Sequence, residues 1–440
     1  MRVNRPIPTK VQYPRVLMVL MTKVKADDPV NLLIRTQFGD WPKEHLAQIH
    51  SNGETSGNGE FCRSYYSLQA CDRFLGVLFR RLRGDVMEMV AADPVVMLRK
   101  DKPAGVLRGW TKSIKKRWGD WLIDSGLWEL IFHVRLSKRM EQFVERFKPD
   151  LIYCQGYSLG FATLPLLIAK RFGIPICFQT TDDWPHAIYS HSPVGWLLRR
   201  RADELIKFAK IRLAFGQKMQ KEYERRYCTP FETTYHLDDP KRFPSHTEDS
   251  SKIFKIIYTG GLGHRRFEAI QDLLVAIRQI PELAGCVEII IHSSGIPKEM
   301  PTGLLQSREV IIVPLPTHEQ LPAILAQAAL LFLPESFNAD RQAIEYSIST
   351  KAHLYMMSGR PILVYGPAFS GTVEYALREE WGLVVAERSG AKLKEALAEL
   401  LVGSERIYQL KQNANSCVSR HHDLAVGRDR FRNLMVDAYL

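Results

Sequence analysis

The chain has 440 residues, 45% of them hydrophobic and 25% charged, which is typical of a globular protein and excludes a disordered one. Its net charge of +12 lies in residues 1–245, which hold 40 lysines and arginines against 26 aspartates and glutamates; the remaining residues hold 20 against 22. This excess favours an anionic surface or acceptor facing the first half, although many cytoplasmic proteins are basic for no specific reason.

The sequence predicts no membrane-spanning helix, signal peptide, disulfide or zinc site. No uninterrupted apolar run approaches the roughly 20 residues of a membrane-spanning helix, and the first ten residues lack the apolar core of a signal peptide. The seven cysteines include no C-x-x-C pair and show no zinc spacing, which favours free thiols in a reducing compartment. We therefore expect a cytoplasmic protein without a resident metal, and we expect no nucleic-acid partner.

Strands and helices are predicted to alternate along the first half. Arg15–Met21 is an apolar run typical of a buried parallel strand, and residues 61–82 and Trp128–Phe147 are predicted to be helical. The elements that follow are a strand at 150–156, a helix at 159–172, a strand at 174–181, a helix at 196–209, a strand at 211–216 and a helix at 217–227. This rhythm predicts a doubly wound α/β domain, whose ligands bind beyond the carboxyl ends of the strands.

A second α/β domain is predicted after a polar stretch, Pro244–Lys252, that has no apolar period. It opens with the strand Phe254–Tyr258, and helices and five more apolar strands follow. The predicted organisation is a first domain at 1–245, a second at 250–420 and a closing helix within 421–440.

The stretch Ser347–Pro367 combines a polar turn, a short helix and a buried strand. Hydroxyl groups and Lys351 stand at the predicted helix start, where free backbone N–H groups and the positive end of the helix dipole attract anions. A simpler interpretation is that Ser349 or Thr350 caps the helix while Lys351 is solvated. Gly359 is predicted to end the helix.

A glycine-rich turn follows the first strand of the second domain. Gly260, Gly261 and Gly263 allow a ligand to approach the backbone closely, and the guanidinium groups of Arg265 and Arg266 suit bidentate contacts with phosphate. Glycines of this kind also occur in tight strand-to-helix turns that bind nothing. Together with Lys351, this turn predicts a cationic pocket for a diphosphate.

The run T-D-D-W-P-H follows a predicted strand of the first domain. Asp182 or Asp183 could take a proton from an acceptor hydroxyl or orient a sugar there, and His186 is a second candidate. The two carboxylates could instead form a turn or a helix cap before Trp184. A metal site is the least favoured interpretation, because no further ligand lies at a suitable spacing.

The stretch from Ser347 resembles the S-x-P-x-K-l-x-E-Y-l-a-x-G-x-P-v segment of glycosyltransferase family 4, which has the two-domain GT-B fold. The matching residues are Ser347, Lys351, Tyr355, Gly359 and Pro361. Ser349 stands at the proline of that pattern, and Leu354 stands at the glutamate that binds the nucleotide ribose in the family. Glu345 and Glu374 are candidates to replace that carboxylate.

The resemblance implies two Rossmann-like domains and transfer of a sugar from a nucleotide sugar to a glycan or lipid-linked acceptor. It implies retention of configuration, no metal and no cofactor beyond the donor substrate. The acceptor side is implied at Asp182, Asp183 and His186. The implied donor-binding residues are Gly260, Gly261, Gly263, Arg265, Arg266, Ser347, Ser349, Thr350 and Lys351. Two alternatives are a sugar-nucleotide epimerase of the same fold and a non-catalytic protein that binds glycan or a partner.

Residues 99–121 resemble a membrane-surface segment in their composition. Basic residues and tryptophans alternate there, and Trp110, Trp118 and Trp121 share one helical face while Lys112 and Lys115 lie elsewhere. An ordinary helix whose tryptophans pack on the sheet has the same pattern. Binding of this segment to the membrane surface would bring the first domain close to a lipid-linked acceptor.

We predict salt-sensitive binding to anionic vesicles, because each lysine or arginine near such a surface contributes about 1 kcal/mol. Changing Lys112, Lys115, Lys116 and Arg117 to glutamine should abolish it. Sedimentation with vesicles is the measurement. A protein that stays in the supernatant at low salt, or a quadruple variant that still pellets, would contradict the prediction.

Overall fold

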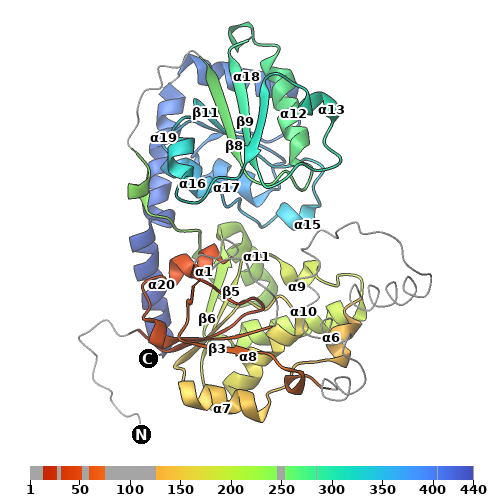
Figure 1. The fold of residues 1–440 in the computed structure, drawn as a ribbon, viewed down its shortest axis with the longest axis vertical. Helices are drawn as coiled ribbons and strands as arrows, with labels where there is room; N and C mark the ends of the chain where they lie inside the picture. Colours follow the sequence, from red (N-terminus) through yellow and green to blue (C-terminus); the bar gives the residue numbers. More distant parts are fainter. Residues whose placement is uncertain are drawn as a thin grey trace, which may run out of the picture. The chain divides into compact units, whose positions relative to one another are not determined.

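The computed structural model describes residues 13–26, 31–51, 59–74, 125–244, 253–283, 285–403 and 405–439. The chain forms two compact units, one of residues 1–214, 220–233 and 428–440 and the other of residues 215–219 and 234–427. Each unit has its own sheet with flanking helices (Figure 1), which confirms the predicted α/β fold of two Rossmann-like domains. The units change over at residues 215, 220, 234 and 428, and the sequence predicts the linker at Pro244–Lys252.

The first unit contains a seven-stranded sheet in the order β3-β2-β1-β4-β5-β6-β7. Strand β1 pairs in parallel on both sides, with Val16 opposite Leu46 in β2 and Leu151 in β4. The strands are β1 Val16–Val19, β2 Leu46–His50, β3 Ser64–Ser67, β4 Leu151–Cys154, β5 Ile176–Thr180, β6 Ile211–Phe215 and β7 Glu232–Thr234. Strand β1 is fully buried, as its continuous apolar run predicted.

The helices of the first unit begin and end at signals that the sequence carries. In α8 the Ser158 hydroxyl accepts a hydrogen bond from the Phe161 N–H at 3.2 Å, and Gly173, with φ of 69°, ends the helix. The helices are α1 Leu32–Gln37, α6 Leu127–Ile131, α7 Lys138–Phe147, α8 Leu159–Phe172, α9 Trp184–Ala187, α10 Pro193–Phe208 and α11 Gln217–Tyr227.

Two predicted helices of the first half are wrong in part. Within 61–74 the chain forms β3 and the 3-10 turn Ala70–Asp72, because Tyr65 and Tyr66 lie in a strand that pairs with β2. The predicted helix from Trp128 to Phe147 is interrupted between α6 and α7, where Val134 forms a bridge with Arg73. Residues 99–121, the predicted membrane-surface segment, lie outside the described residues.

The second unit contains a six-stranded sheet in the order β10-β9-β8-β11-β12-β13, and all five strand pairs are parallel. The strands are β8 Phe254–Thr259, β9 Val287–Ser293, β10 Val310–Pro314, β11 Leu330–Pro334, β12 Ile362–Tyr365 and β13 Leu383–Val385. The direction in which the strands are added reverses between β8 and β11. In open parallel sheets, ligands bind beyond the carboxyl ends of the strands at such a switch point.

Helices cover both faces of the second sheet, with α12 and α19 on opposite sides of it in Figure 1. The helices are α12 Arg266–Ile277, α13 Thr302–Leu305, α14 Leu321–Leu325, α15 Arg341–Ile344, α16 Ala352–Met357, α17 Gly371–Glu379, α18 Gly390–Val402, α19 Glu405–Cys417 and the π-helical turn η5 Val418–His422. The last helix, α20 Leu424–Tyr439, contributes Phe431, Met435 and Ala438 to the core of the first unit.

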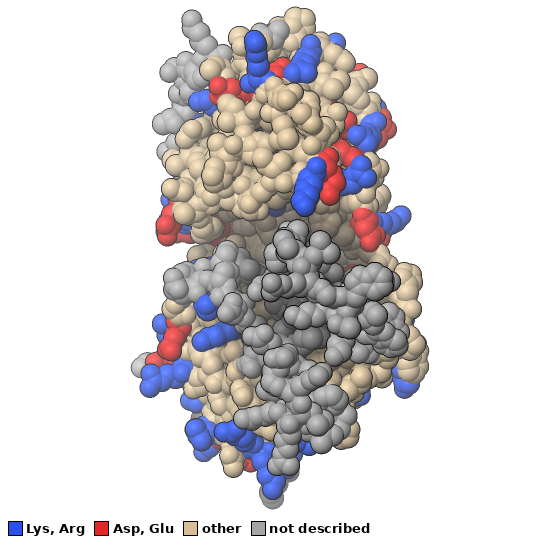
Figure 2. Space-filling model, turned by 45° about the vertical axis from the view of Figure 1, so that its right-hand side comes forward, with Lys and Arg blue, Asp and Glu red and all other residues tan. Residues whose placement is uncertain are grey.

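The surface charges differ between the units. Figure 2 shows lysines and arginines without acidic neighbours at the lower end of the first unit, whereas most basic side chains visible on the second unit lie beside acidic ones. Arg278 with Glu309 and Arg388 with Asp272 are examples of such pairs in the second unit. No helix in the described part of the chain is long and apolar enough to cross a membrane.

Three histidines stack in the second unit, of which His353 and His422 are buried and His236 is half-buried. The ring of His353 lies 5.5 Å from that of His236 and 5.6 Å from that of His422. The Tyr375 hydroxyl lies 2.8 Å from Nε2 of His422. Burial lowers the pKa of His236 to about 4 and that of His422 to about 3, and it holds the pKa of His353 well below its ordinary value. The three rings are therefore neutral at pH 7.

We expect the second unit to lose stability as the pH falls below about 6.5, the pKa of histidine in an unfolded chain. Above that pH the rings are neutral in both states. Between 6.5 and about 4, the value for His236, the unfolded chain binds protons that the folded unit excludes. Each histidine then lowers the free energy of unfolding by about 1.4 kcal/mol per pH unit.

Urea unfolding at stepped pH measures this dependence. His353→Phe should give a shallower slope than the parent protein. Equal slopes for His353→Phe and the parent protein would contradict the prediction.

Candidate functional site

The predicted phosphate residues of the second unit gather at the switch point of its sheet. The turn Gly260–Arg265 follows β8, and Glu335 directly follows β11. Ser347–Lys351 precede α16, between β11 and β12. These segments contact one another through Lys351, which lies against Gly260, and through Glu335, which binds Arg266.

The glycine turn is shaped around the Lys351 side chain. A Cβ atom at Gly260 would lie 2.4 Å from Cε of Lys351 and 2.8 Å from its Nζ, so only glycine leaves room for the lysine. Cβ atoms at Gly261 and Gly263 would meet nothing within 4 Å, so this side of the turn is open. The Tyr258 hydroxyl holds the turn by donating to the Gly261 carbonyl at 2.7 Å.

Lys351 is a largely buried cation that contacts no counter-charge among the residues the structure describes. Its ammonium group makes no hydrogen bond or ion pair with any residue that the structure describes. Burial and, to a smaller extent, the charge of Arg266 lower the pKa of Lys351, Glu335 acts in the opposite direction, and the net pKa is about 8. The group is mostly charged at pH 7, and a bound anion would stabilise the charged form.

Arg266 differs from Lys351, because a buried carboxylate neutralises it. Its Nη2 lies 3.0 Å from Oε2 of Glu335, and the Arg266 and Glu335 side chains are 18% and 4% exposed. The Thr372 hydroxyl donates to Oε1 of Glu335 at 2.9 Å and accepts a hydrogen bond from the Ser349 N–H at 2.9 Å. One carboxylate therefore ties together the segments that carry Arg266, Ser349 and the start of α17.

Sequence reasoning missed Glu335. The available signal was its position, because an acidic residue stands directly at the carboxyl end of the apolar strand Leu330–Pro334. Gly366 leaves room for the Glu335 side chain, since a Cβ atom at residue 366 would lie 2.6 Å from Cβ of Glu335.

The remaining predicted donor residues lie at the edge of this cluster. Arg265 is 62% exposed at its side chain and pairs with Glu268. Thr350 is exposed, and Ser347 and Ser349 are half-buried. The simpler interpretation of this turn, in which Ser349 or Thr350 caps the helix, is wrong: the N-cap is Lys351, and no side chain caps α16.

No carboxylate stands at the ribose position of the resembled family. Leu354 is 7% exposed and belongs to the core. Glu345 pairs with Arg341 at 2.7 Å, and Glu374 pairs with Arg378 at 2.6 Å, so ion pairs hold both of the candidate replacements.

In the first unit, Asp182 follows β5 in a network of hydroxyl groups. Tyr157 donates to Oδ2 of Asp182 at 3.0 Å, and the Thr181 hydroxyl lies 3.3 Å from the same oxygen. The Thr180 hydroxyl donates to the Asp182 carbonyl at 2.7 Å. Asp182 is half-buried, and no ion pair involves it among the described residues.

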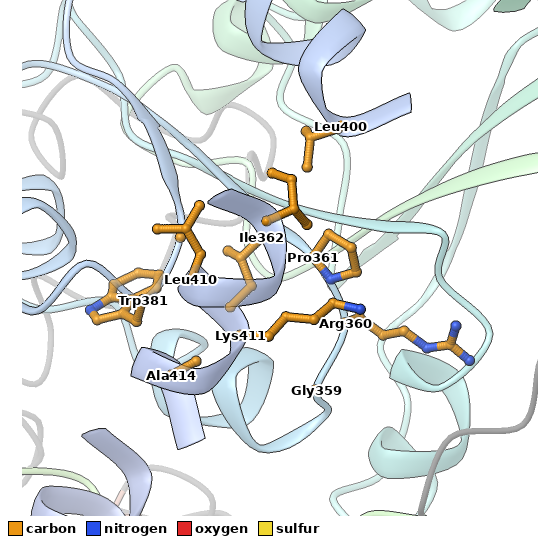
Figure 3. Close-up of a pocket in the computed structure, with 11 residues that line it drawn as sticks. Gly359, Arg360, Pro361, Ile362, Trp381, Leu400, Leu410, Lys411 and Ala414 are labelled. Carbon is orange, nitrogen blue, oxygen red and sulfur yellow. The ribbon is translucent and has the colours of Figure 1, made fainter. Parts of the chain in front are cut away.

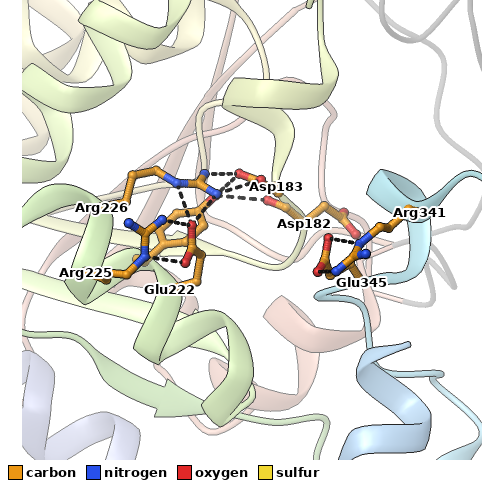
Figure 4. A network of polar contacts seen from close by, with 8 residues as sticks. Asp182, Asp183, Glu222, Arg225, Arg226, Arg341 and Glu345 are labelled. Atoms are coloured by element: carbon orange, nitrogen blue, oxygen red, sulfur yellow. Dashed lines mark hydrogen bonds and ion pairs between the residues drawn. The ribbon is translucent and has the colours of Figure 1, made fainter. Parts of the chain in front are cut away.

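Asp183 instead belongs to a half-buried ion pair (Figure 4). The Arg226 guanidinium donates to Asp183 at 2.7 and 3.2 Å, and the Tyr223 hydroxyl donates to Oδ1 at 3.1 Å. Glu222 also pairs with Arg226 at 3.0 Å. These bonds occupy the Asp183 carboxylate, which favours a structural role for it.

His186 lies on α9, directly after these carboxylates. Burial and the charge of Arg226 lower the pKa of His186, while Asp183 acts against them. The ring is therefore neutral at pH 7. The described residues contain no group of three or more histidine, cysteine, aspartate or glutamate side chains that could hold a metal ion.

A separate small pocket lies at the amino ends of β12 and β13 (Figure 3). Its walls are mostly apolar, from Pro361, Ile362, Leu400 and Leu410, and Lys411 reaches into it. This end of the sheet is opposite to the one that carries Gly260 and Glu335. The pocket therefore does not belong to the cluster around Lys351.

No family model matches the chain, and no curated protein matches its sequence. Solved structures share its fold. HepE of Anabaena, solved in complex with UDP, matches with a TM-score of 0.62 and 12% identity over 96% of this chain and all of that one. Sucrose-phosphate synthase of Thermosynechococcus elongatus matches at 0.59 and 13% over 97% and 99%. A UDP-forming trehalose-phosphate synthase of Burkholderia vietnamiensis matches at 0.56 and 14% over 96% and 99%. At these identities the likeness shows the two-domain GT-B type of fold.

We predict that Asp183→Asn lowers the free energy of unfolding of the first unit by about 2 kcal/mol, less than the about 3–5 kcal/mol of a fully buried pair, because this pair is half-buried and Glu222 remains to bind Arg226. Asp182→Asn keeps an acceptor oxygen for Tyr157 and should cost less than about 1 kcal/mol. Denaturant unfolding of both variants is the measurement. Equal losses of unfolding free energy in the two variants would show that the ion pair of Asp183 does not stabilise the first unit more than the hydrogen bonds of Asp182 do.

Proposed function

We propose that the chain is a glycosyltransferase that moves a sugar from a nucleotide sugar to a glycan or lipid-linked acceptor. The observation that carries the proposal is Lys351, a largely buried cation that makes no ion pair within the described ranges and lies over Gly260, where the sheet order reverses. Phosphate groups of a nucleotide fit such a position, because the open side of Gly261 and Gly263 admits a ligand to the backbone.

In the proposed reaction, the bond between the sugar and the nucleoside diphosphate breaks, and negative charge grows on the leaving phosphate. The Lys351 ammonium stabilises this charge, and Arg266 contributes from its fixed position beside Glu335. Preorganised cations in a site shielded from water are an effective form of electrostatic catalysis. We propose a reaction that needs no metal ion. Retention of configuration, and membership of family 4, rest on the resemblance of the stretch at Ser347–Pro361.

On the acceptor side, Asp182 is the favoured group of the three predicted residues. Its carboxylate has hydroxyl partners and no cation partner among the described residues. It can therefore accept a proton, or a hydrogen bond from a sugar hydroxyl. Asp183 is engaged by Arg226. His186 is neutral at pH 7 and can accept a proton through a ring nitrogen.

Two other functions predict different results. An epimerase of this fold would convert a nucleotide sugar without any acceptor, and a non-catalytic protein would release no nucleotide from any donor. Leu354 at the ribose position is the observation that favours the non-catalytic alternative. A cytoplasmic location with peripheral membrane contact through residues 99–121 is part of the proposal and rests on the sequence alone.

The first test is binding of UDP, the nucleotide bound by HepE in its solved complex. We predict that Lys351→Ala weakens UDP binding roughly ten- to a hundredfold. A hydrogen bond to a charged group contributes about 1.5–3 kcal/mol, which corresponds to that change in affinity. Binding of uridine, which lacks the phosphates, should hardly change. Calorimetry with both ligands is the measurement.

Lys298→Ala, at an exposed lysine of the same unit, is the matched control and should bind UDP like the parent protein. Equal losses for UDP and uridine in Lys351→Ala would remove Lys351 from the phosphate site. Failure of the parent protein to bind UDP, GDP or ADP would overturn the proposed function.

A further inference from the structure

Glu335 is a negatively charged residue within a cluster that is proposed to bind a negatively charged phosphate. It is 3% exposed and places a negative charge beside the two cations that are proposed to bind an anion. Burying a carboxylate is costly unless partners satisfy both of its oxygens. Arg266 and Thr372 provide those partners, one for each oxygen.

The charged groups that act on Lys351 are few. Arg266 lowers its pKa and Glu335 raises it. His236, whose own pKa of about 4 reflects its burial and the charge of Lys351, is neutral near pH 7. The Tyr258 hydroxyl also lies beside the Gly260 turn, and burial raises its pKa. Between pH 6 and 9, Lys351 is therefore the member of this group that titrates.

We propose that Glu335 is the positioning residue of this site, which fixes Arg266 in place and keeps Lys351 charged at neutral pH. Without the carboxylate, Lys351 would share a buried site with Arg266 alone, and two like charges there favour the neutral amine. Through Thr372 the same carboxylate also holds the Ser349 backbone, two residues before Lys351. The ligand of the site rests on the proposed function, whereas the action of Glu335 on Lys351 does not.

A merely structural Glu335 would affect stability without changing the protonation of Lys351. The test is therefore the rate of acetylation of Lys351 by acetic anhydride as a function of pH, read by mass spectrometry of its peptide. In the parent protein the labelling midpoint should lie at about 8. In Glu335→Gln it should fall by about one pH unit, the lower end of the effect of a neighbouring opposite charge.

Two variants provide the controls. Thr372→Val removes a hydrogen bond to Glu335 but keeps its charge, so it should lower stability and leave the midpoint unchanged. Arg266→Gln removes the cation and should move the midpoint to higher pH. A folded Glu335→Gln protein with an unchanged or raised midpoint would overturn the proposal.

The double variant Arg266→Gln/Glu335→Gln keeps the test valid if Glu335→Gln alone does not fold. Removing both partners of a buried ion pair is often neutral for stability. The midpoint in the double variant should lie below that in Arg266→Gln, and equal midpoints would overturn the proposal.

A second readout uses UDP and separates the two proposals. In the parent protein, UDP affinity should fall by up to about tenfold per pH unit above the Lys351 midpoint, because the neutral amine no longer attracts the phosphates. In Glu335→Gln this fall should begin at lower pH. If UDP does not bind at all, the proposed function fails, whereas the acetylation midpoints still decide the role of Glu335.

Discussion

The second unit depends on one buried ion pair, that of Glu335 with Arg266. A buried pair contributes little net stability, but losing either partner leaves a largely buried charge unpaired. This constraint explains features that are otherwise unrelated. Gly366 must lack a side chain because Glu335 lies against it, and Thr372 must supply a hydroxyl to the second oxygen. The pair therefore fixes the ends of three loops at the point where a ligand of a parallel sheet binds.

Because Arg266 is neutralised, the charge left over in this cluster belongs to Lys351. Its position depends on Gly260, since any side chain there would occupy the space of the lysine. His264 and Arg265 follow in the left-handed region, with φ of 54° and 60°. Such conformations are costly outside glycine and persist where the surrounding structure fixes them. The turn is therefore shaped by the lysine and its surroundings as well as by its own glycines.

The sheets could be predicted from the sequence because their central strands are buried on both faces, which requires continuous apolar runs such as Val16–Val19 and Leu330–Pro334. The edge strand Ser64–Ser67 has no such run and was predicted as part of a helix. The roles of Glu335 and Asp183 could not be predicted. Their arginine partners lie 69 and 43 residues away, and only tertiary structure distinguishes Asp183 from its neighbour Asp182.

Considered separately, the two units have the same arrangement of charges. In each, an arginine and a carboxylate that are largely shielded from solvent form an ion pair at the carboxyl end of a strand, Arg226 with Asp183 in one and Arg266 with Glu335 in the other. Beside each pair stands a charged group without an ion pair among the described residues, Asp182 in the first unit and Lys351 in the second. A neutralised pair gives rigidity and leaves little net charge at its position, while its arginine keeps further N–H groups for a ligand. The remaining charge then determines what each site can bind or do: a carboxylate accepts protons or hydroxyl groups, and an ammonium attracts phosphate.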